Sequence, residues 1–200
     1  IARRLMYWQV YLHKTVIAAE QTLIHILKRA KQLSTQGHTL FAPPPLSWFL
    51  NNEFCFDCLN NEDHKDEMLK HFVQLDDSDL ISSIKVWCND SDFILSYLSN
   101  SIVKRKLLKI KISDKSFGEK VKSQMKKKAQ TQFNIDEQDV AYFVFSGKIS
   151  NNIYETNTDE IMVLAKDGKA KSMDKASDID LQALTRKVSK YFWCYPKELV

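Results

Sequence analysis

The sequence of 200 residues lacks several features that would assign it to a class of protein at once. It contains no apolar run close to the roughly 20 residues of a membrane-spanning helix, and it does not open with a signal-peptide pattern. Its four cysteines are too few for the disulfide framework of a small secreted protein. We therefore expect a cytoplasmic protein from a reducing compartment, with no membrane among its partners.

A helix start signal is also missing at the beginning of the chain. Residue 1 is Ile, and none of the usual N-cap residues (Ser, Thr, Asp or Asn) precedes the first residues of the helical pattern. Because the pattern opens as if inside a helix, we expect the chain to be the C-terminal part of a longer protein.

The composition is that of a globular protein with a slight basic excess. Lys and Arg number 29 against 25 Asp and Glu, which gives a net charge of +4, and 44% of the residues are hydrophobic. The apolar content is enough for a packed core. The excess of positive charge suits a small anionic ligand without requiring nucleic acid.

Hydrophobic periodicity predicts a mainly helical body followed by a smaller α+β C-terminal region with an antiparallel sheet. One long helix is expected over residues 2–33, a loop over 34–52, and further helices within 67–75, 76–89 and 91–110, with Asp76–Ser78 as cap candidates. Alternation at Leu108, Ile110 and Ile112 then favours a strand, and 118–133 favours a basic helix. Strands are expected within 139–147 and 160–168, with a hairpin turn at Asp167-Gly168, and a closing helix over 180–196 ended by Pro196. We accordingly divide the chain into 1–112 and 113–200.

A polar stripe is expected along the first helix, formed by Arg3, Tyr7, Tyr11 and Lys14. At helical spacing these residues lie on one side, away from the apolar face. Arg and Lys supply charge-assisted donors to phosphate, and tyrosine offers a flat face and a hydroxyl to a sugar or base. The stripe is thus chemically suited to a nucleotide, although the same spacing also fits core tyrosines with solvated neighbours.

The segment RRLMYWQVYLHKTV, residues 3–16, resembles a helix of the HD-domain deoxynucleoside triphosphate triphosphohydrolases, the dGTPase family. The matching positions are Arg3, Tyr7, Tyr11, His13 and Lys14. The resemblance implies that Arg3 reaches the substrate phosphates and that Tyr7 and Tyr11 border the sugar. Some members of the family have histidine in the place of Tyr7.

A second segment, SIVKRKLLKIKI at residues 101–112, is similar to a family segment in which an arginine and a lysine clamp an activating nucleotide between subunits. Arg105 and Lys109 match those positions. The resemblance therefore implies an effector-nucleotide site made of His13, Lys14, Arg105 and Lys109, and a homo-oligomer.

One departure from the family is large. HD enzymes hold a divalent metal with a histidine, a His-Asp pair and a distant aspartate, but Asp follows none of the five histidines here. We therefore expect the metal site in a missing N-terminal part, no catalytic or metal-binding residue in this chain, and no activity of the chain on its own.

Two other patterns have weaker interpretations. Cys55 and Cys58 form a single CxxC pair near His64, which could bind zinc, but a lone pair among apolar residues is more typical of buried thiols. The basic run at residues 120–128 could contact nucleic acid, but without an aromatic signature it is more typical of a solvated face.

The leading interpretation is the C-terminal part of a metal-dependent dNTP triphosphohydrolase, with deoxynucleoside triphosphates as partners and nucleic acid not expected. The alternatives are an HD-family phosphohydrolase acting on another phosphate ester, or a non-catalytic basic nucleotide- or nucleic-acid-binding or oligomerisation module.

Overall fold

The computed structural model of the protein describes residues 6–53, 62–151, 162–164, 168–172 and 188–200. Helices dominate the first half, and an antiparallel sheet follows, which confirms the fold class expected from the sequence. The helices are η1 (Tyr7–Tyr11, a π-helix), α2 (Lys14–Thr35), α3 (Pro44–Asn51), α4 (Glu62–Gln74), α5 (Asp77–Trp87), α6 (Phe93–Val103), α7 (Glu119–Phe133) and the short 3-10 turns η3 (Asp139–Tyr142) and η4 (Lys197–Leu199). The strands are β1 (Lys109–Ser113), β2 (Phe145–Asn151), β3 (Met162–Leu164), β4 (Ala170–Ser172) and β5 (Val188–Tyr195).

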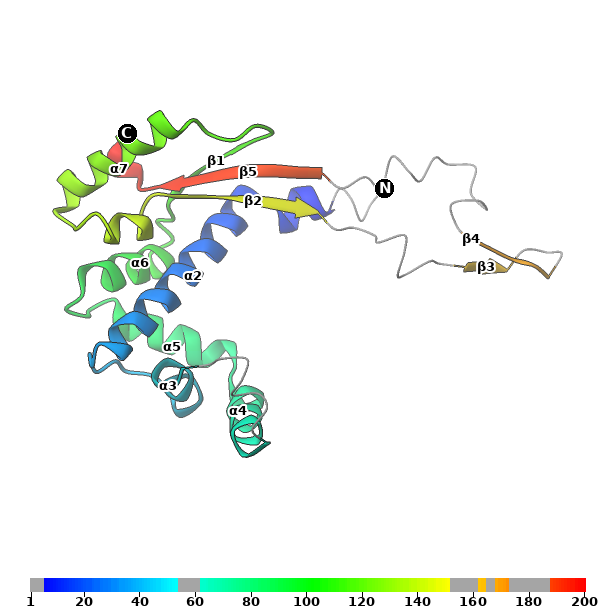
Figure 1. The fold of residues 1–200 in the computed structure, drawn as a ribbon, viewed down its shortest axis with the longest axis horizontal. Coiled ribbons are helices and arrows are strands. Elements are labelled where there is room, and N and C mark those ends of the chain that lie inside the picture. Colours follow the sequence, from blue (N-terminus) through cyan, green and yellow to red (C-terminus); the bar gives the residue numbers. More distant parts are fainter. Residues whose placement is uncertain (1–5, 54–61, 152–161, 165–167, 173–187) are drawn as a thin grey trace.

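Helix α2 is the central element of the helical body. Its buried face carries Ile26, Ala30 and Leu33, which pack in one core with residues of α3, α5, α6 and α7. Helix α5 starts at one of the cap candidates expected from the sequence, because Asp76 is its N-cap and forms a capping box with Asp79. In Figure 1, α3, α4 and α5 lie at the end of the molecule opposite to α7.

Strand β5 lies in the middle of a three-stranded antiparallel sheet with the order β1-β5-β2. One face of this sheet, with Phe192 and Cys194 at its centre, packs on the first turns of α2 through Ile17. The opposite face presents Trp193 and Tyr195, which belong to the main core and lie on the α7 side. Figure 1 shows α2 and α7 on either side of the sheet.

Two segments differ from the sequence-based expectation. The closing helix predicted over 180–196 is wrong where the chain is described, because residues 188–195 form β5. This segment is rich in aromatics and alternates between two buried sheet faces, and that environment favours a strand over its weak helical pattern. The loop predicted over 34–52 contains α3, whose first positions are Pro44 and Pro45, where the missing N–H of proline costs nothing.

The other elements agree with the predictions more closely. Residues 109–113 and 119–133 form the expected strand and basic helix. Strands β3 and β4 pair antiparallel, and Gly168 between them has a φ of 74°, while Asp167 of the predicted turn lies outside the described residues. The strand expected within 139–147 begins only at Phe145, after the turn η3. The boundary proposed at residue 112 falls inside β1, and the main core contains residues from both sides of it.

Among the described helices, none combines the length and apolar character that crossing a membrane requires.

Candidate functional site

The first helix of the sequence analysis is interrupted, so the expectation of one helix over residues 2–33 is wrong. The π-helix η1 ends at Tyr11, and His13 has an extended conformation with φ −66° and ψ 142°. The Nδ1 atom of His13 accepts a hydrogen bond from the Thr15 N–H at 3.2 Å, so the imidazole caps the start of α2. The physical reason for the break is that this side chain satisfies a first-turn donor that a continuous helix would bond to a carbonyl.

The break changes the polar stripe expected on this helix. Arg3 lies outside the described residues, and Tyr7 is the first residue of η1, in a part where only the backbone is described. Tyr11 ends η1 with 54% of its surface exposed, and Lys14 opens α2 as an exposed residue. Tyr11 and Lys14 therefore belong to two different helical segments, while Tyr7 and Tyr11 share one.

The first turn of α2 is fixed against the sheet. Ile17 is 1% exposed and lies in one buried cluster with Leu108, Phe192 and Cys194. Ile17 is three residues after Lys14, and Leu108 is three residues after Arg105. This contact therefore brings the start of α2 and the turn between α6 and β1 to the same region of the molecule, together with the residues expected to bind an effector.

Arg105 has a backbone conformation that favours glycine. Its φ is 54°, directly after the C-cap residue Lys104 of α6. The Arg105 N–H donates to the carbonyl of Ile102 at 3.1 Å, and the Lys106 N–H donates to that of Ser101 at 2.9 Å, which is the Schellman pattern of helix ends. A left-handed non-glycine residue costs about 1–2 kcal/mol, and such strain is typical of positions kept for another reason.

Lys109 has a different orientation from its neighbours. Leu108 and Ile110 face the cluster around Ile17, so alternation along β1 directs Lys109 to the opposite face of the sheet. There it pairs in register with Tyr195, next to Lys111, whose Nζ lies 5.8 Å from the centre of the Tyr195 ring. Within one copy of the chain, Lys109 thus lies on the other side of the sheet from the start of α2.

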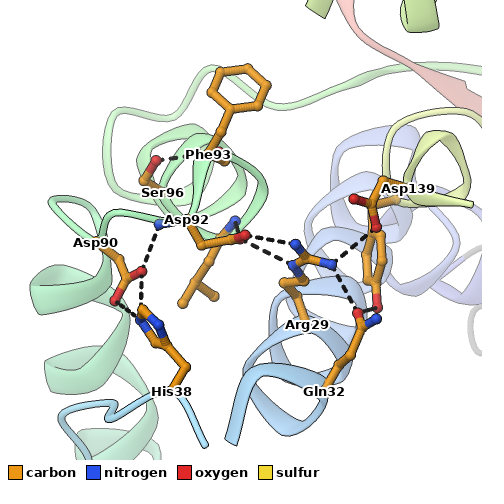
Figure 2. A network of polar contacts seen from close by, with 10 residues as sticks. Arg29, Gln32, His38, Asp90, Asp92, Phe93, Ser96 and Asp139 are labelled. Atoms are coloured by element: carbon orange, nitrogen blue, oxygen red, sulfur yellow. Dashed lines mark hydrogen bonds and ion pairs between the residues drawn. The ribbon is translucent and has the colours of Figure 1, made fainter. Parts of the chain in front are cut away.

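A polar network that was not predicted from the sequence holds α2 in place (Figure 2). Arg29, 9% exposed, donates from Nε and Nη2 to Asp92 at 3.1 and 2.6 Å, and from Nη1 to Asp139 at 3.0 Å. Gln32 Oε1 accepts from Arg29 at 2.9 Å and from the Tyr142 hydroxyl at 2.8 Å. The sequence did contain one indication of this network: Arg29 falls within the buried face of the helix, and a buried cation requires hydrogen-bonding or charged partners.

A second pair of residues extends this network toward the loop after α2. Asp90 accepts from His38 Nε2 at 3.1 Å and from the backbone N–H of Asp92 at 2.8 Å. The loop, α2 and the start of α6 are therefore joined by side chains that bond to one another (Figure 2). The role of this network is structural: it holds α2, which begins at Lys14 with His13 as its N-cap, in a fixed position.

The described residues do not provide a metal site. No group of three His, Cys, Asp or Glu side chains in the described ranges is placed to hold a metal ion. Cys55 and Cys58 lie outside those ranges, and of His64 only the helical backbone is described, so zinc binding by this segment stays a hypothesis.

Comparison with known proteins adds an independent observation. No protein-family model matches the chain. The chain is 26% identical over 223 residues to the uncharacterized protein YwfO of Bacillus subtilis (strain 168), covering 100% of this chain and 44% of that protein. A crystal structure of a phosphohydrolase from Bacteroides thetaiotaomicron VPI-5482 superposes with a TM-score of 0.87 at 40% identity, covering 98% of this chain and 48% of that one.

The chain has the fold of part of that phosphohydrolase. It spans about half the length of either relative. The likeness extends over nearly all of this chain, so it includes α2 and the turn before β1 as well as the sheet.

Proposed function

We propose that the chain is part of a phosphohydrolase, and more narrowly of an HD-type enzyme that converts a dNTP to a deoxynucleoside and triphosphate. The observation that carries the proposal is the 40% identity to a phosphohydrolase over 98% of the chain. The narrower substrate class is supported by the family resemblance of residues 3–16.

In this proposal the chain supplies binding groups. The Arg3 guanidinium neutralises charge on the substrate phosphates, and Tyr7 and Tyr11 border the sugar. Tyr11 is 54% exposed. A tyrosine against the sugar also excludes a ribose 2′-hydroxyl by contact, which would favour deoxynucleotides.

The divalent metal of an HD enzyme does not fit the residues of this chain. The described side chains form no three-ligand group, and no histidine of the sequence is followed by aspartate. We therefore assign the metal to another part of the protein and assign no catalytic step to this chain.

The proposed effector site is made of His13, Lys14, Arg105 and Lys109. The contact of Ile17 with Leu108 and the left-handed conformation of Arg105 support the grouping of the first three. Lys109 leaves the other face of β1, away from the other three within one copy of the chain, so the proposed site requires the Lys109 of a second copy.

The test is a triphosphate-release assay on the protein that contains the remaining part, with all four dNTPs, GTP and a nucleoside monophosphate. We expect metal-dependent release of triphosphate from dNTPs, and none from the 200-residue chain alone. Arg3→Ala should lose about 2–4 kcal/mol of transition-state stabilisation, the range for one lost donor to a developing charge. If phosphate were released from the monophosphate and no triphosphate from any dNTP, the proposal of a dNTP triphosphohydrolase would be wrong. The broader proposal of a phosphohydrolase would still hold.

Tyr11→Phe separates the sugar contact from general damage to the helix. We expect it to reduce the ratio of kcat/KM between dGTP and GTP, because only the hydroxyl is removed. Val10→Ala, an exposed neighbour in η1, is the matched control and should keep the ratio. An unchanged ratio in Tyr11→Phe would contradict the role of Tyr11.

A further inference from the structure

The outward face of α7 carries a stripe of basic and amide side chains. Its members recur at helical spacing and are all exposed; we call them the α7 stripe: Lys120, Gln124, Lys127, Lys128 and Thr131. The opposite face of α7 is anchored in the core by Ala129, which is 0% exposed, with Met125 and Phe133 beside it. Because α7 is held by that face, the stripe keeps a fixed orientation toward solvent.

An open hollow of about 800 Å³ lies along this stripe. It is lined by Gln124, Lys127, Lys128, Thr131, Gln132 and Leu199. Gln132 Nε2 donates to the backbone carbonyl of Glu198 at 3.3 Å and so ties α7 to η4 across the hollow. The carboxylate of Glu198 accepts from the Tyr97 hydroxyl at 3.1 Å, so that nearby negative charge already has a hydrogen-bond donor.

The positive charge of the stripe is not neutralised within the part of the chain that the structure describes. Lys120, Lys127 and Lys128 have no carboxylate partner there, and Glu119 bonds to Lys122 at 2.6 Å, on another side of the helix. Residues 104–128 contain eleven Lys and Arg against two acidic residues. The exposed lysines of the stripe belong to this basic segment, and positive charge that is not neutralised attracts polyanions.

The chemistry of the stripe distinguishes between kinds of polyanion. Protein interfaces are depleted in Lys at their centres and have aromatic or apolar anchors. Among the described residues that line this hollow, Leu199 is the single apolar one. Lysine and glutamine side chains are common donors to phosphate oxygens. The stripe extends over the twelve residues from Lys120 to Thr131, about 16 Å along the helix axis, which is long enough for several phosphates of one strand.

We propose that the α7 stripe binds the phosphate backbone of a nucleic acid, with Lys120, Lys127 and Lys128 as the cationic contacts. Binding is independent of base sequence, because the stripe presents no aromatic side chain for stacking. The sequence alone favoured a solvated face for this run; the proposal departs from that preference because of the hollow beside the lysines. The site lies on the far side of the sheet from the start of α2 and is independent of the proposed hydrolase activity.

The test is fluorescence anisotropy of the purified protein with a labelled 20-nucleotide single strand and a 20-base-pair duplex between 50 and 200 mM KCl. Three phosphate contacts predict a slope of log K against log salt of about −2 for the single strand and about −2.7 for the duplex. Over this range affinity should fall by about 20-fold and 40-fold respectively. The double variant K127E/K128E should lose at least 10-fold in affinity at 50 mM KCl and have a shallower slope.

The matched control is K85E/K148E, which changes the net charge equally at exposed positions on α5 and β2. The control should bind as the wild type does, and circular dichroism should show both variants folded. Equal losses in the two double variants would overturn the proposal, because total charge alone would then explain binding. Absence of binding at 50 mM KCl would also overturn it, as would self-association that K127E/K128E abolishes without any effect of nucleic acid.

Discussion

Arg29 and Asp92 form a side-on ion pair that joins the middle of α2 to the start of α6. Nη2 of Arg29 lies 2.6 Å from Oδ2 of Asp92, and Nε lies 3.1 Å from Oδ1. The same Oδ1 atom accepts the N–H of Leu95 at 2.7 Å and so caps α6. One carboxylate therefore serves both as a helix cap and as the partner of a nearly buried arginine (Figure 2).

Asp92→Asn removes the charge of this side chain and keeps its capping ability, because asparagine is as good an N-cap residue as aspartate. We expect the free energy of unfolding to fall by about 1.5–3 kcal/mol, the range for a hydrogen bond to a charged group. The loss is limited because Asp139 still pairs with Arg29. Chemical denaturation measures it, with the exposed Asp77→Asn as control; equal stabilities of the two variants would contradict a structural role for the pair.

Asp92→Asn should also change how the free energy of unfolding depends on pH in the acid range. Burial disfavours the charged carboxylate of Asp92, but hydrogen bonds from Arg29 and Leu95 and the charge of Arg29 outweigh it and lower the pKa below 3.8. A carboxyl whose pKa is lower in the folded state stabilises the protein above its unfolded-state pKa of about 3.9 and loses that effect as the pH falls through the folded-state pKa. The unfolding free energy of the wild type should therefore drop more steeply below pH 4 than that of Asp92→Asn.

His25 provides a second dependence on pH at a different range. Its ring stacks on Phe145 with centres 4.1 Å apart, and burial, aided by the charge of Lys28, lowers its pKa to about 4. The unfolded chain binds a proton at about pH 6.5, so the folded state loses stability as the pH falls from about 6.5 to 4. We expect His25→Phe, which keeps an aromatic ring there, to remove this part of the loss in denaturation curves measured from pH 4 to 8. If the free energy of unfolding depended on pH in the same way in His25→Phe and in the wild type, His25 would not be the source of this loss.

The sequence predicted the elements that local patterns define. The cap at Asp76, the basic helix at 119–133 and the antiparallel pairing of β3 with β4 all depend on neighbours in the chain, and the structure confirms them. Strand β5 could not be predicted in this way, because its buried aromatics are set by strands and helices that are distant in sequence. The pairing of Arg29 with Asp92 could not be predicted from the sequence either, since the two residues are 63 positions apart.

Gly147 and Phe192 are in contact across β2 and β5, and this contact fixes how the sheet packs. A Cβ atom at position 147 would lie 2.5 Å from Cζ of the Phe192 ring, which is 5% exposed and has little room to move. Gly147→Ala should therefore lower the free energy of unfolding by about 1–3 kcal/mol, the usual cost of overpacking. Ser146→Ala, at an exposed position of the same strand, should be close to neutral, and Phe192→Leu should restore part of the loss in Gly147→Ala. A neutral Gly147→Ala would contradict the close packing.

The candidate site was accessible from the sequence only in part. Residue types and the family resemblance singled out His13, Lys14 and Arg105, and the contact of Ile17 with Leu108 brings their segments to one region. The break at His13 was not predicted, because its cap is a side-chain bond to Thr15 and leaves the apolar periodicity unchanged. The predicted alternation of Leu108, Ile110 and Ile112 places Lys109 on the opposite face of the strand, but the sequence did not show which face packs against α2.

Arg105→Gly separates stability from binding, because the two effects have opposite signs at this position. Glycine adopts a φ of 54° without strain, so the variant should unfold at higher denaturant concentration, with a gain of about 0.5–1 kcal/mol. If the guanidinium holds a nucleotide phosphate, its loss should weaken dNTP binding by at least about 10-fold, as expected for one charge-assisted hydrogen bond. Asn134→Gly is the matched control, since Asn134 ends α7 with a φ of 49° and carries no charge. It should gain a smaller stability and keep the affinity, because asparagine tolerates this conformation better than arginine. Isothermal titration with dNTP, together with denaturation of both variants, gives the two readouts. A stabilised Arg105→Gly with unchanged affinity would show that the strained arginine has no part in binding an effector.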